Sequence, residues 1–79
     1  MDTASLIKML NDIGSFYETM PDQSQAIEDM ARHIRAFWDP RMREAMALYL
    51  EQHPKGLESN LEIKDFSIKA FSYMQKNLA

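Results

Sequence analysis

The chain has 79 residues, no cysteine and a formal net charge of −3, and these properties exclude several classes of protein. A chain of this length can build only one small hydrophobic core, so we expect a single domain over residues 1–79. The absence of cysteine removes disulfides, thiol catalysis and cysteine-based zinc sites. Net acidity argues against nucleic-acid binding, and no apolar run reaches the roughly 20 residues that span a bilayer. We therefore expect a soluble, cytoplasmic protein.

The first helix is predicted over residues 3–18. Its apolar side chains recur at helical spacing and form one stripe: Leu6, Met9, Leu10, Ile13, Phe16 and Tyr17. Gly14 lies inside this stripe, where glycine costs about 1 kcal/mol relative to alanine. Either another backbone comes close to the helix at Gly14, or this glycine merely weakens the last turn.

The second helix is predicted over residues 22–38. Asp22 is a good N-cap, and Gln25 stands three residues later, at capping-box spacing. Two of the arginines in or near this helix have acidic neighbours at i, i+4 spacing: Arg32 follows Glu28, and Arg35 precedes Asp39. Such exposed pairs contribute only about 0.2–0.5 kcal/mol each, but they would account for two arginines without any function.

Asp39 and Pro40 predict a tight corner between the second helix and a third one over residues 40–52. Proline disfavours a helical conformation for the residue before it, and it suits the first position of a new helix. Asp39 is also a good N-cap for that helix. A single kinked helix would fit the same residues.

The fourth helix is predicted over residues 60–77, with Ser59 and Glu62 as its capping box. Its apolar residues form two stripes, so this helix is expected to be central or to contact another chain. No stretch alternates with a period of two residues. The predicted fold class is therefore all-α, a small four-helix domain with a tight corner at Asp39-Pro40.

Residues 30–43 differ from the rest of the chain in charge and in aromatic content. They hold all four arginines against one aspartate, a net of +3, together with the only tryptophan. A compact basic segment in an acidic chain is typical of a surface that binds a partner. The alternative is that the arginines pair with local acids and remain solvated.

Catalytic and metal-binding constellations are scarce. The two histidines, His33 and His53, are far apart, and the two glycines do not form a phosphate-binding loop. We read His33 as a helix-flank side chain that partly covers the core. The join at Asp39-Pro40 is shorter than the turn of a DNA-binding helix-turn-helix. We expect no catalytic residue and no metal ligand.

The run from His33 to Arg43, HIRAFWDPRMR, resembles the signature of the delta subunit of NAD-dependent formate dehydrogenase. The N-terminal part is also similar to this family, at Leu6-Ile7, at residues 13–17 (IGSFY) and at residues 20–22 (MPD). The resemblance covers residues 3–53.

The resemblance implies a non-catalytic accessory subunit of a cytoplasmic molybdenum or tungsten enzyme. This subunit would bind, and stabilise or help assemble, the large molybdopterin-containing formate dehydrogenase subunit. The complex is expected to carry bis-molybdopterin guanine dinucleotide, iron–sulfur clusters, FMN and NAD, with no cofactor held directly by this chain. Two alternatives remain: a transient maturation chaperone that contacts the molybdenum cofactor through arginines, and a self-assembling helical module, so homo-oligomers of the isolated chain stay open.

The site residues divide into two predicted groups. The partner-binding group is Arg35, Arg41 and Arg43, with Arg32 and His33. The structural group is Phe37, Trp38, Asp39, Pro40 and Met42, in which the two aromatic residues are expected to be buried in the corner. Arg35 and Arg43 each stand four residues from Asp39, and one carboxylate cannot satisfy both, so surplus donors are expected to face a partner.

Overall fold

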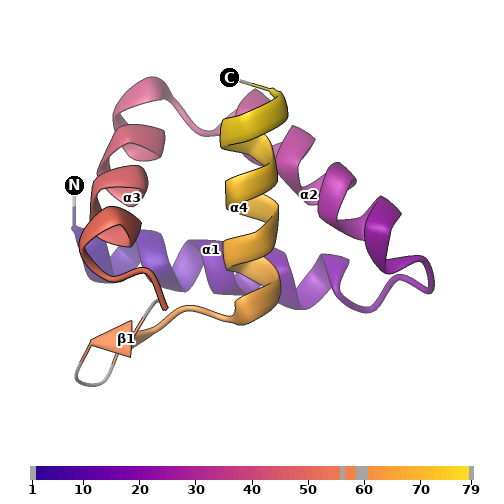
Figure 1. Cartoon of the computed structure of the whole chain (residues 1–79), viewed down its shortest axis with the longest axis horizontal. Coiled ribbons are helices and arrows are strands. Elements are labelled where there is room, and N and C mark those ends of the chain that lie inside the picture. Colours follow the sequence, from indigo (N-terminus) through magenta and orange to yellow (C-terminus); the bar gives the residue numbers. More distant parts are fainter. Residues whose placement is uncertain (1, 56, 59–60, 79) are drawn as a thin grey trace.

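The computed structural model describes residues 2–55, 57–58 and 61–78. These residues form four helices, α1 (Thr3–Tyr17), α2 (Gln23–Phe37), α3 (Pro40–Gln52) and α4 (Asp65–Asn77) (Figure 1). A small antiparallel pair, β1 (Leu57–Glu58) and β2 (Leu61–Glu62), precedes α4. The predicted all-α class is confirmed, although the strand pair, with two residues in each strand, was not predicted.

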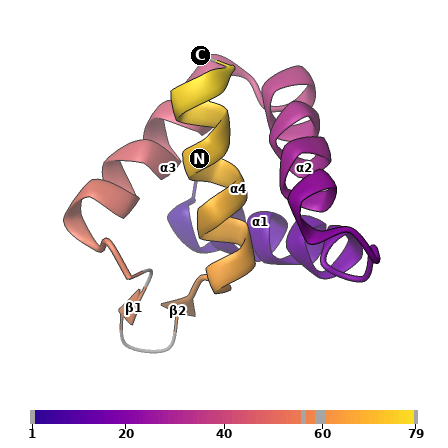
Figure 2. The ribbon, with the colours of Figure 1, turned by 45° about the vertical axis from the view of Figure 1, so that its right-hand side comes forward.

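Helix α4 stands between α2 and α3, while α1 crosses beneath it (Figures 1 and 2). Its closest packing is against α2, and it also contacts α1, which agrees with its apolar side chains on more than one face. Helix α3 packs on α1. The largest fully buried side chains of the core come from all four helices: Leu6, Leu10, Met30, Ile34, Met46, Ser67 and Phe71.

The corner between α2 and α3 is confirmed. Trp38 and Asp39 both have extended backbone conformations, so α2 ends and α3 begins at Pro40 rather than continuing as one kinked helix. The Asp39 carboxylate accepts a hydrogen bond from the Met42 N–H at 3.0 Å, which caps α3. The sequence determines this corner locally, because proline and the N-cap act within one helical turn.

The N-terminus of α2 is capped as predicted, but only half of the capping box forms. The Asp22 carboxylate accepts from the Gln25 N–H at 3.1 Å. The Gln25 side chain does not reach back to Asp22. It donates to the Asp29 carboxylate at 2.8 Å, one turn further along the helix.

The predicted start of the fourth helix near residue 60 is wrong, because α4 begins at Asp65. Glu62 lies in β2, so it does not occupy a helical capping position, and Ser59 lies outside the described residues. The side chain of Asn11 in α1 holds the intervening segment in an extended form. It donates to the Glu62 carbonyl at 2.7 Å and accepts from the Lys64 N–H at 2.8 Å. Ile63 between them is buried in the core.

Candidate partner-binding site

Two of the four arginines are bonded within the chain itself. Arg32 pairs with Glu28, as predicted. The predicted pairing of Arg35 with Asp39 is wrong, since the Arg35 Nε donates instead to the Leu78 carbonyl at 3.0 Å, beside the C-terminal end of α4. The extended backbone at Trp38 takes Asp39 out of the helical register of α2, so i, i+4 spacing no longer brings it to Arg35.

The other two arginines, Arg41 and Arg43, have no hydrogen-bond or ion-pair partner among the residues that the structure describes. Arg41 is exposed. Arg43 is half-buried, and its Nε is shielded from solvent with no acceptor in reach among the described residues. Because they stand two residues apart on one helix, these side chains leave α3 in different directions, so the predicted cluster of arginines is not one continuous patch.

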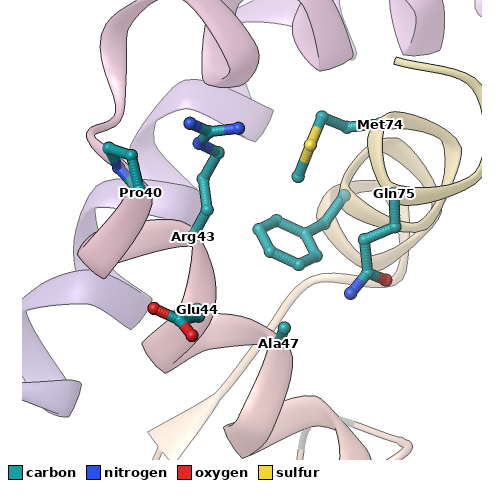
Figure 3. Close-up of a pocket in the computed structure, with 7 residues that line it drawn as sticks. Pro40, Arg43, Glu44, Ala47, Met74 and Gln75 are labelled. Carbon is teal, nitrogen blue, oxygen red and sulfur yellow. The ribbon is translucent and has the colours of Figure 1, made fainter. Parts of the chain in front are cut away.

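Arg43 projects into a hollow of about 410 Å³ between α3 and α4 (Figure 3). We call this hollow the α3–α4 groove. Its lining comes from these two helices: Pro40, Arg43, Glu44, Ala47, Phe71, Met74 and Gln75. The groove exists because α3 packs against α1 and α4 packs against α2, which leaves these two helices apart.

Trp38 and Phe37 have opposite environments. Trp38 is buried, only 4% exposed, with its ring centroid 6.3 Å from that of Phe71, so its predicted structural role agrees with its burial. The prediction that Phe37 is also buried in the corner is wrong, because it is 75% exposed. Phe37 is the last helical residue of α2, and its side chain points away from the core. Trp38 has an extended backbone, and its side chain points into the core.

Phe37 belongs to a row of aromatic side chains that was not predicted from the sequence. The ring of His33 lies 4.8 Å from that of Phe37 and 6.0 Å from that of Tyr17, and Phe16 lies 5.1 Å from Tyr17. Phe16 is 69% exposed, although the helical pattern placed it in the buried stripe. Adjacent residues are turned by about 100° on a helix, so Phe16 can point outward while Tyr17 stays partly buried against the core.

Metal-binding geometry is not found in the described part of the chain, where no group of three or more His, Cys, Asp or Glu side chains converges. His53 stacks on Tyr49 with ring centroids 4.4 Å apart. No helix among the described residues has the length and apolar character needed to cross a bilayer.

Contact of the arginines with the phosphates of a molybdenum cofactor stays a prediction. Arg32 and Arg35 are bonded within the chain, and the α3–α4 groove presents one guanidinium between largely apolar walls. Recognition of several phosphates usually takes several converging donors.

Comparison with known families agrees with the signature in the sequence. The model of the family described as NADH-dependent formate dehydrogenase delta subunit FdsD matches residues 5–62. This range covers α1 from its third residue onward, α2, α3 and the β1–β2 pair, and therefore the α3 wall of the groove. Comparisons with curated proteins and with solved structures found no match. Since the family model covers well over half of the 79 residues, the chain belongs to the formate dehydrogenase delta subunit family.

Proposed function

We propose that this chain is a non-catalytic accessory subunit that binds and stabilises, or helps to assemble, the molybdopterin-bearing large subunit of its formate dehydrogenase. The observation that carries the proposal is that Arg41 and Arg43 have no acceptor among the described residues. Both lie within the run that carries the family signature and within the matched range. Cationic side chains left unsatisfied by their own chain are suited to acidic groups on a partner.

The energetics of arginine make this proposal testable. Truncating an arginine at the centre of an interface can cost about 2 kcal/mol or more of binding free energy. Removing the exposed Arg41 is expected to change the free energy of unfolding by no more than about 0.5 kcal/mol. Removing the half-buried Arg43 loses no hydrogen bond of its Nε, which has no acceptor among the described residues. Arginine variants are therefore expected to lose association with the partner while keeping nearly the wild-type free energy of unfolding.

The test uses a tagged chain co-expressed with the other subunits of the dehydrogenase. We expect the double variant Arg41→Ala/Arg43→Ala to melt near the wild-type temperature and to be lost from the complex on affinity purification. The matched control is Lys8→Ala/Lys69→Ala, which removes two positive charges from exposed i, i+4 pairs outside residues 30–43. The control variant is expected to remain in the complex.

The opposite result would exclude the arginines as the partner-binding site. If the arginine double variant is fully retained and formate oxidation is normal, the aromatic row becomes the better candidate. Its members are Phe16, Tyr17, His33 and Phe37, of which Phe16 and Phe37 are exposed.

Subunit stoichiometry separates stable association from assisted assembly. A stable subunit co-purifies in equal amount with the mature, cofactor-loaded enzyme. An assembly factor associates with the cofactor-free large subunit and is released from the mature one. Quantitative mass spectrometry of both forms distinguishes these outcomes, and the absence of the chain from both would contradict the proposal.

A further inference from the structure

The Nε–H of Arg43 is a hydrogen-bond donor that the described residues leave unsatisfied. It is shielded from solvent and has no acceptor among the described residues. Buried polar groups in proteins nearly always have a hydrogen-bond partner, and a charged group without one is costly. An exception of this kind requires an explanation. An acceptor supplied by another molecule is one, provided that its entry into the groove displaces the side chains that shield the Nε.

The surroundings of Arg43 in the α3–α4 groove are mainly apolar. Phe71 and Met74 line the α4 side, while Pro40 and Ala47 line the α3 side. Figure 3 shows the Arg43 guanidinium extending toward Met74, whereas the Glu44 carboxylate stays beside α3. Methionine side chains adapt their shape to a bound surface, so this wall can accommodate an incoming side chain.

We infer that the α3–α4 groove receives a short segment of a partner subunit that places one carboxylate on Arg43 and apolar side chains against Phe71 and Met74. The inference rests on the proposed function and specifies where, and by which chemistry, the partner is recognised. Charge complementarity favours a carboxylate, because Arg43 is the cationic side chain of the lining and its Nε has no acceptor among the described residues. A guanidinium binds a carboxylate in a planar, two-point geometry.

A protein segment fits this groove better than a small free anion. Small-molecule sites position their ligand with several converging polar groups. Here Arg43 is the one cationic group of the lining, and the other polar side chains are Glu44 and Gln75. Glu44 also lines the groove and repels any anion, so a multiply charged phosphate is disfavoured more strongly than a single carboxylate. A segment with an Asp or Glu between apolar residues matches both the charge and the walls.

The first experiment compares three variants of the full chain in the dehydrogenase complex. Arg43→Met keeps an apolar side chain in the groove and removes the unsatisfied donor, so it is expected to melt at or above the wild-type temperature. Its association is expected to weaken by about thirtyfold or more, since truncating one member of a desolvated charge pair has effects of this size. Arg43→Lys is expected to be intermediate, and the exposed control Lys69→Ala is expected to bind like wild type.

The second experiment locates the occupant without altering Arg43. A photoreactive benzoylphenylalanine replaces Gln75, which is exposed and lines the groove, and in a control chain it replaces Lys8 on α1. The inference predicts that only the Gln75 probe cross-links to a dehydrogenase subunit, at a peptide with an acidic residue among apolar ones. Exchanging the charges, with Arg43→Glu in this chain and arginine in place of that acidic residue, is expected to restore association.

The outcomes separate this inference from the proposed function. If the complex forms, Arg43→Met binds like wild type and the Gln75 probe does not cross-link, the groove is not the docking site, and the inference is overturned while the proposed function stands. Cross-linking of the Gln75 probe to a second copy of this chain also overturns it. If the wild-type chain is not retained by any dehydrogenase subunit, the proposed function itself fails.

Discussion

Gly14 of α1 and Ser67 of α4 meet where these two helices pack together. A Cβ atom added at Gly14 would lie 2.1 Å from the Ser67 hydroxyl oxygen and 3.4 Å from its Cβ. Ser67 is fully buried, and its hydroxyl donates to the Leu10 carbonyl at 3.1 Å. A close approach is therefore the reason for a glycine at this position, although a side chain rather than a second backbone makes it.

Gly14→Ala is expected to destabilise the protein, even though alanine favours a helix. The added methyl group would overlap the Ser67 hydroxyl, and overpacking of a core costs about 1–3 kcal/mol. The gain in helix propensity, about 1 kcal/mol, offsets only part of that cost. Thermal and urea unfolding of the single variant measure the net effect.

A double-mutant cycle with Ser67→Ala tests the mechanism. Ser67→Ala alone is expected to cost about 1 kcal/mol through loss of the hydrogen bond to Leu10. Removing the hydroxyl also makes room for the methyl group, so the double variant is expected to be more stable than the sum of the two single effects. Additive effects would mean that the contact between residues 14 and 67 is not the cause.

Trp38→Ala is expected to lower the free energy of unfolding by about 3–5 kcal/mol, because it removes a large buried ring from the corner between α2 and α3. This loss is a large share of the stability of so small a domain. The matched control is Phe37→Ala, an adjacent aromatic truncation at a side chain that is 75% exposed, with an expected change of about 0.5 kcal/mol or less. Equal effects of the two changes in chemical unfolding would contradict the opposite burial of these neighbours.

Asn11→Ala is expected to destabilise the start of α4. Its side chain bonds both the Glu62 carbonyl and the Lys64 N–H, and α4 has no side-chain N-cap of its own. Loss of two hydrogen bonds is expected to cost about 1–3 kcal/mol and to speed hydrogen exchange of the Lys64 amide. The neighbouring change Asp12→Ala removes an exposed ion pair with Lys8 and serves as the control. Unchanged exchange at Lys64 in the Asn11 variant would show that the segment is held by other contacts.

The corner at residues 38–40 was predictable from sequence, because every interaction that makes it acts within a few residues. Proline restricts its own backbone and that of the residue before it, and the Asp39 carboxylate reaches the Met42 N–H three positions on. The same local character made the Arg32–Glu28 pair and the three N-terminal helices predictable. The family signature, residues 33–43, includes this corner.

The tertiary structure decided the features that depend on residues far apart in the chain. Asn11 bonds residues 51 and 53 positions away just before α4 begins, and Arg35 bonds Leu78 across 43 positions. The groove that isolates Arg43 forms because α3 and α4 pack on different helices. Helical periodicity specifies which face of a helix is apolar, but it does not specify which other helix covers that face or where a gap is left.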